Sequence, residues 1–96
     1  MGIDSFLQSV ENNVPLETIS VYLKALWYDA KGNWNKSHEI IQDVPDRNAS
    51  WIHAYLHRKE GDTWNANYWY NRAGRDMPDI SLDEEWEQIT KEMLSQ

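Results

Sequence analysis

Apolar residues recur along this chain at intervals of three and four positions, which is the period of an α-helix with one buried face. Near the N-terminus, Ile3, Phe6 and Val10 follow this spacing. No segment alternates between apolar and polar residues with the period of two that is typical of a strand. The pattern therefore predicts an all-α fold. The expected helices lie over about residues 3–12, 16–30, 34–44, 49–60, 64–73 and 81–94.

The residues between these segments favour short turns. Gly32, Gly61 and Gly74 each follow an expected helix, and glycine readily takes the left-handed backbone conformation that ends one. Ser81 and Glu84 have the spacing of a capping box at the start of the last segment. Because the connections are short, we expect helices that follow one another to run antiparallel.

One spaced set of residues occurs twice in the chain, 29 positions apart. Its small residues allow two helices to approach closely, while Gly followed by Asp or Asn makes a turn and caps the next helix. Each copy of the set therefore predicts a helical hairpin. The first copy is Ala25, Gly32, Asn33, Ser37, Ile41 and Val44, and the second is Ala54, Gly61, Asp62, Ala66, Tyr70 and Ala73.

The second copy, followed by Pro78, resembles the tetratricopeptide repeat and the related Sel-type repeat. This resemblance covers about residues 21–78 and implies a right-handed stack of helical hairpins that serves protein–protein contact. The chain departs from the repeat in its short period and in the polar Ser50, His53 and His57, which take positions that usually hold large apolar residues. The implied single domain comprises repeats at about 21–49 and 50–78, with capping helices at about 3–12 and 81–94.

The segment WIHAYLHRKEGD, residues 51–62, also resembles a family of small uncharacterised bacterial proteins. That resemblance implies no activity.

Composition and charge exclude several classes of protein. The 96 residues contain no cysteine, which excludes disulfides and thiolate chemistry. The net charge of −7 is concentrated in residues 76–96, which contain seven acidic side chains and one basic side chain. The chain would therefore repel the phosphates of nucleic acids. No apolar run reaches the length of a membrane span, and the N-terminus lacks the features of a secretion signal. We therefore expect a cytoplasmic protein that binds neither nucleic acid nor membrane.

His53, His57 and Glu60 are spaced at i, i+4 and i+7, which places them on one face of a helix. Two histidines at this spacing can chelate zinc with a carboxylate as third ligand, and His38 or Glu39 on the preceding helix could complete the set. The alternative is structural, with His53 and His57 hydrogen-bonded to side chains of the following helix, namely Asn67, Tyr68 or Tyr70. We prefer the structural interpretation, because no general base lies between the two histidines.

Aromatic side chains give the second functional indication. The expected helix over residues 64–73 carries aromatic side chains on several faces, and its hairpin partner can cover only one of them. The side chains that need another contact are Trp64, Tyr68 and Trp69, with Arg72 beside them. An excess of Trp and Tyr is typical of protein interfaces, and a second copy of the chain is the simplest partner to propose.

The sequence contains no nucleophile elbow and no glycine-rich phosphate loop, and it implies no cofactor. The leading hypothesis is a helical protein-interaction scaffold that associates with itself and shows no evident catalytic activity. The alternative hypothesis is a small metal- or ligand-binding protein, with hydrolysis as one use of the site, centred on His38, His53, His57 and Glu60.

Overall fold

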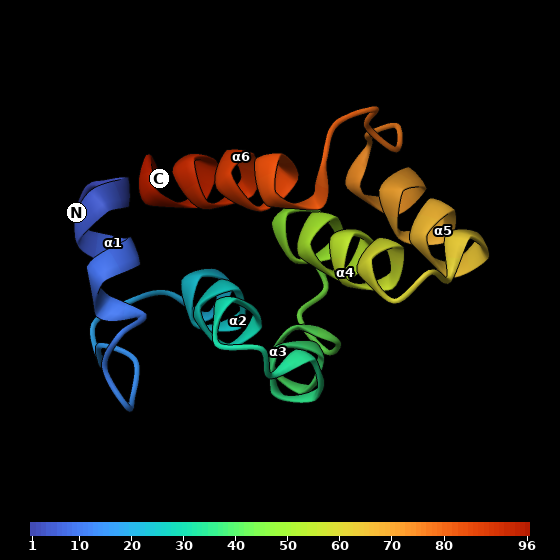
Figure 1. Ribbon diagram of the computed structural model, residues 1–96. Helices are drawn as coiled ribbons and strands as arrows, with labels where there is room; N and C mark the ends of the chain where they lie inside the picture. Colours follow the sequence, from blue (N-terminus) through green and yellow to red (C-terminus); the bar gives the residue numbers. More distant parts are fainter.

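The computed structural model describes residues 1–96 and contains six α-helices and no strand, which confirms the prediction of an all-α chain. The longest helices have 13 residues, and none is both long and apolar enough to cross a membrane. Figure 1 shows the order of the helices along the chain. They are α1 (Ile3–Ser9), α2 (Val21–Ala30), α3 (Trp34–Ile41), α4 (Arg47–Lys59), α5 (Thr63–Ala73) and α6 (Leu82–Leu94).

Five of the helices begin at a residue whose side chain caps the backbone. In each case the side-chain oxygen accepts a hydrogen bond from the backbone N–H three positions later, which satisfies one of the free donors at the start of the helix. Gly61, between α4 and α5, has a φ of 85°, a conformation that glycine adopts without steric cost. The capping residues are Ser20, Asn33, Asp46, Asp62 and Ser81.

Two helical hairpins, α2–α3 and α4–α5, lie side by side and account for most of the packing between helices. The small residues at their crossings are fully buried: Ala25 and Ser37 in the first hairpin, Ala54 and Ala66 in the second. Ser37 donates its hydroxyl proton to the carbonyl of Ala25 at 2.6 Å, which ties α3 to α2. The close approach of the helices thus follows from small side chains at matched positions.

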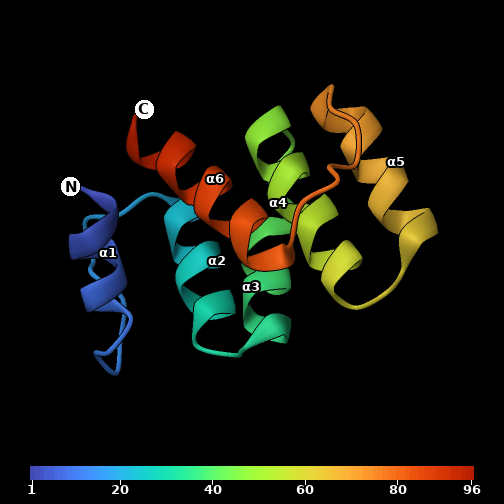
Figure 2. The ribbon, with the colours of Figure 1, turned by 45° about the horizontal axis from the view of Figure 1, so that its top comes forward.

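The sixth helix lies across α2 and α4, on one side of both hairpins (Figures 1 and 2). Among the other helices, α6 also contacts α1, whereas its backbone does not approach α5. Its apolar face contributes Ile89 and Met93 to the core, while Trp86 donates its indole proton to the carbonyl of Leu26 at 3.1 Å. The helix therefore covers the two hairpins from one side.

The largest difference from the sequence prediction is the start of α2, at Val21 instead of about residue 16. Ser20 ends the preceding turns and caps the helix by accepting a hydrogen bond from the N–H of Leu23. Ile19 is nevertheless buried, so its apolar spacing reflects contact with the core from a turn and not from a helix. Apolar spacing alone cannot distinguish these two cases.

Candidate functional site: a three-histidine cluster between the hairpins

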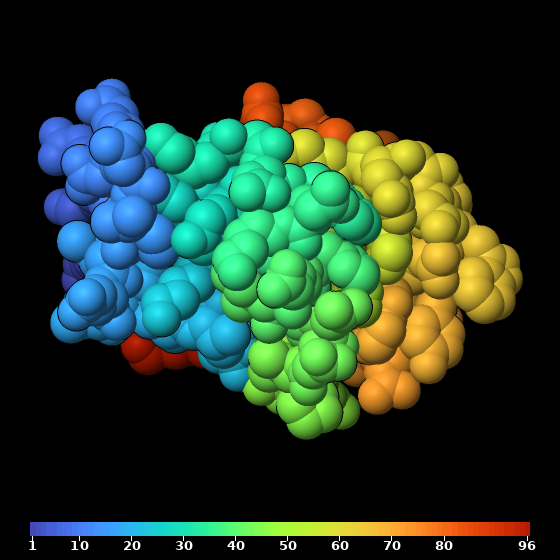
Figure 3. All heavy atoms as spheres, turned by 90° about the horizontal axis from the view of Figure 1, so that it is seen from below, coloured from blue at the N-terminus to red at the C-terminus, as the bar shows by residue number.

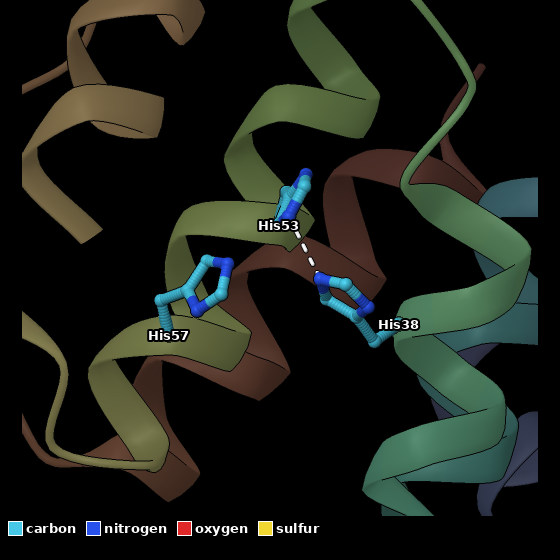
Figure 4. A group of neighbouring side chains, drawn as sticks. All are labelled: His38, His53 and His57. Atoms are coloured by element: carbon cyan, nitrogen blue, oxygen red, sulfur yellow. Dashed lines mark hydrogen bonds between the residues drawn. The ribbon is translucent and has the colours of Figure 1, made fainter. Parts of the chain in front are cut away.

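Three imidazole rings meet where the first hairpin packs against the second. His38 comes from α3, and His53 and His57 come from successive turns of α4 (Figure 4). One ring nitrogen from each histidine can be chosen so that all three lie within 4.8 Å of one another. The shortest approach is 3.0 Å, between Nε2 of His38 and Nε2 of His53. The structure thus brings together all three histidines of the chain.

Trp34 supports the cluster from the side of α3. Its indole ring stacks on His38, one turn further along the helix, with ring centroids 4.9 Å apart and planes 9° from parallel. Its N–H donates to the carbonyl of Leu56 on α4 at 2.8 Å, so one side chain holds His38 and also joins the two hairpins. Aromatic rings in such contact restrict each other's rotation, because the favourable stacking depends on orientation.

Trp69 forms the opposite wall of the cluster, from α5. Its ring lies almost flat on His53, with centroids 3.9 Å apart and planes 18° from parallel. His53 is therefore held between an indole on one side and the imidazole of His57, stacked at 4.8 Å, on the other. Only 5% of its surface reaches solvent. The ring has little freedom to turn away from its neighbours.

Burial and mutual repulsion keep two of the three rings neutral. Removal from water, with the nearby His38 and His57 acting in the same sense, lowers the pKa of His53 to about 3. Burial also lowers the pKa of His38, with His57 again adding to the effect. A neutral imidazole has a lone pair on one of its two nitrogens, which metal coordination requires, so these rings could act as ligands.

Glu60 orients the third ring. Its carboxylate contacts Nδ1 of His57, and because a carboxylate only accepts, the ring must donate its proton from Nδ1. The lone pair of a neutral His57 is then on Nε2. A carboxylate that fixes a histidine tautomer in this way is a usual neighbour of a metal-bound imidazole. Asp62 lies within ligand distance of His57 and Glu60, so the exposed side of the cluster is acidic.

The hydrogen bonds that the structural interpretation expected for the histidines are not formed. Neither His53 nor His57 bonds to Asn67, Tyr68 or Tyr70, and the partners are instead His38, Trp69 and Glu60. The register of the hairpin directs Tyr70 toward α6, where its hydroxyl donates to the carboxylate of Glu85. That part of the sequence prediction is wrong, because it turned this face of α4 toward α5 alone, whereas His53 contacts His38 of α3 as well as Trp69 of α5.

The four residues predicted as an interaction surface separate into two groups. Trp64 and Tyr68 are exposed, with 76% and 45% of their surface in contact with solvent. Trp69 is only partly exposed because it covers His53, and Arg72 lies over the rings of Tyr68 and Trp69. Trp69 thus belongs to the histidine cluster, and the remaining three lie along the outside of α5.

Sequence reasoning missed one buried network entirely. Glu85 has no exposed surface and accepts hydrogen bonds from Trp51, Arg58 and Tyr70. The signal was present in the spacing, since Glu85 lies three positions after Leu82 and four before Ile89 on the apolar face of the helix.

The histidine cluster is separate from the hollows of the surface. A hollow of about 550 Å³ lies beside the two chain ends, and another of about 280 Å³ lies between α1, α2, α4 and α6. Neither is lined by a histidine. The three histidines are therefore packed among side chains and do not line either hollow.

Comparison of the chain with protein-family models, with curated proteins and with solved structures finds no match to any of them.

Proposed function

We propose that this protein binds a transition-metal ion through His38, His53 and His57. The observation that carries the proposal is the convergence of three imidazoles from two helices, with their ligand nitrogens within 4.8 Å of one another. Zinc–nitrogen bonds are about 2.0–2.1 Å long, so two nitrogens on one tetrahedral ion lie about 3.3 Å apart. The rings therefore need only small movements to bind an ion.

The donor atoms indicate the class of metal. Imidazole nitrogens suit zinc, copper, nickel and iron, whereas calcium and magnesium prefer oxygen ligands. No thiolate is present in the chain to favour an iron–sulfur cluster or a four-cysteine zinc site. Three histidines leave one position of a tetrahedral ion for water or another small ligand, as in zinc sites that have three protein ligands. Zinc is accordingly the first ion to test.

The position of the cluster suggests what a bound ion would do to the fold. His38 belongs to the first hairpin, and His53 and His57 belong to the second, so an ion held by all three would join the two units. We also propose that these hairpins are two tetratricopeptide-like repeats, an arrangement supported by the matched small residues and by the glycine turns. In that view the metal fixes the angle between consecutive repeats.

Thermal unfolding with and without zinc tests the proposal, after removal of carried-over metal with a chelator. An ion that binds only the folded state raises the free energy of unfolding by about 2.7 kcal/mol when its free concentration is 100 times the dissociation constant. For a chain of this size the melting temperature should rise by about 10 °C. His38→Ala and His53→Ala should abolish the rise, and titration calorimetry should give one zinc per chain for the wild type.

Glu39→Ala is the matched control, since Glu39 is exposed on α3 one position after His38 and should leave the zinc response unchanged. Glu60→Gln should weaken zinc affinity by about 10-fold or more, because the amide no longer accepts the His57 proton as strongly. A wild-type melting temperature that does not respond to zinc would overturn the proposal. So would a response that survives both histidine substitutions.

A further inference from the structure

Three residues spaced four apart form a continuous exposed stripe on α5: Trp64, Tyr68 and Arg72, named here the α5 outer face. The rings of Trp64 and Tyr68 are parallel within 9°, with centroids 6.3 Å apart. The guanidinium of Arg72 lies 5.8 Å from the centre of the Tyr68 ring and donates to its hydroxyl at 3.4 Å. The stripe is therefore already ordered, and a partner would bind it without a large cost in side-chain entropy.

This face is uncovered because of the path of the chain after α5. The backbone of α5 packs against α4 alone, and it lies at one end of the molecule (Figures 1 and 2). A stack of helical hairpins normally ends in a helix with a polar outer face, which keeps the end soluble. Here the next helix, α6, turns back over α2 and α4, so the end of the stack presents the indole of Trp64 instead.

The distribution of charge favours a second copy of the same chain at this end. Residues 47–73, which form the α4–α5 hairpin and its turn, carry four basic and two acidic side chains. The rest of the chain carries five basic and 14 acidic side chains, so most other contacts between two copies would bring excess negative charge together. Contact through α5 avoids this repulsion, because residues 63–73 contain no acid.

The polar groups beside the stripe also suit a symmetric contact. Asn67 and Asn71 are exposed on α5, and each amide both donates and accepts hydrogen bonds. A two-fold axis brings the same patch of both copies together, so a group that can pair with itself is satisfied there. We propose that two copies of the protein associate through the α5 outer face, with Trp64 at the centre of a symmetric interface.

Analytical ultracentrifugation over a range of protein concentrations tests this proposal, in a buffer with a metal chelator. The wild type should form a dimer and no larger species. Trp64→Ala should weaken the dimer by about 10-fold or more, since buried tryptophans are frequent hot spots. Asn67→Glu should also weaken it, because the two-fold axis places the new negative charges near each other.

Val14→Ala is the matched control, because Val14 is exposed on a distant turn and its truncation should leave the dimer unchanged. A wild type that stays monomeric at the highest concentration would overturn the proposal, as would a dimer that resists both α5 substitutions. Open-ended assembly would exclude a symmetric contact. A dimer that forms only when zinc replaces the chelator, and that disappears in His53→Ala, would be bridged by metal, which would support the three-histidine site and reject the aromatic interface.

Discussion

The fold changes the chemistry of His53 by removing its ring from water. Trp69 covers one face of the imidazole and His57 covers the other, while Nε2 meets His38. None of these neighbours is an anion that would stabilise a proton on the ring. Burial is consequently the main reason that the pKa of His53 drops to about 3. The ring of His53 is therefore neutral in the folded protein near pH 7.

This lowered pKa predicts that the protein loses stability in mild acid. In the unfolded chain His53 binds a proton below about pH 6.5, whereas in the folded chain it does so only near pH 3. The stabilisation is thus complete above pH 6.5 and decreases as the pH falls toward 3. Between pH 7.5 and 5.5 the free energy of unfolding should fall by about 1 kcal/mol more in the wild type than in His53→Gln. Urea denaturation with chelator present at both pH values measures this difference, and equal losses in the two proteins would contradict the assigned pKa.

The sequence predicted which histidines come together, but it did not predict which side chains surround them. Spacing at i and i+4 placed His53 and His57 on one helical face, and the preceding helix made His38 a candidate. The stacking of Trp34 and Trp69 depends on how three helices cross, and a single sequence does not contain those angles. The direction of the Glu60 contact, and with it the tautomer of His57, likewise follows only from side-chain positions.

At the scale of helices, the α4–α5 hairpin depends on two alanines. Ala54 and Ala66 have no exposed surface, and the helices that carry them form the most extensive helix–helix contact of the molecule. A longer side chain at either position would push the helices apart, because protein interiors are packed at nearly the density of organic crystals. The crossing also sets the distance from Trp69 on α5 to His53 on α4.

We predict that Ala66→Leu lowers the free energy of unfolding by about 1–3 kcal/mol, as inserted methylene groups usually do in a packed interior. Chemical denaturation monitored by circular dichroism gives the value. Ala30→Leu, at an exposed position of α2, adds the same atoms without overpacking and should change stability by about 0.5 kcal/mol or less. If Ala66→Leu were as stable as the wild type, the register of the hairpin would have to differ.

Helix starts could be predicted where a capping residue precedes the apolar pattern. This holds for α3, α5 and α6, which begin directly after Asn33, Asp62 and Ser81, within one residue of the expected starts. The start of α4 is two residues earlier than expected, since Asp46 caps it directly. The location of α6 could not be predicted, because the apolar spacing of a helix defines its buried face but not the helices against which that face packs.

The whole molecule measures 34 × 23 × 22 Å, and α6 covers only one of its two broad sides. One side is covered by α6, and Figure 3 shows the other side, where α3 lies in front and α6 is visible only at the edges. On the side that α6 covers, the carboxylate of Glu85 holds α6 against the second hairpin. It accepts hydrogen bonds from Arg58 on α4 at 2.8 Å and from Tyr70 on α5 at 2.6 Å, so one buried group of α6 joins the second hairpin.

Removing that carboxylate should be costly. Glu85→Ala leaves the guanidinium of Arg58 and two other donors without their acceptor, and loss of one partner from a buried ion pair typically costs about 3–5 kcal/mol. Denaturation by urea provides the measurement. Glu92→Ala removes an exposed acid from the same helix and should shift stability by about 0.5 kcal/mol or less. A small effect at Glu85 would mean that α6 is held mainly by its apolar face.

The position of α6 also has a consequence for the order in which the chain folds. Each hairpin closes a short loop, whereas α6 must find partners far away in sequence, such as Trp86 with Leu26, which are 60 residues apart. Closing long loops costs more entropy and slows folding. We therefore expect the hairpins to form early and α6 to dock late. Substitutions at the hairpin crossings should then slow folding, while substitutions in the α6 contacts should mainly speed unfolding.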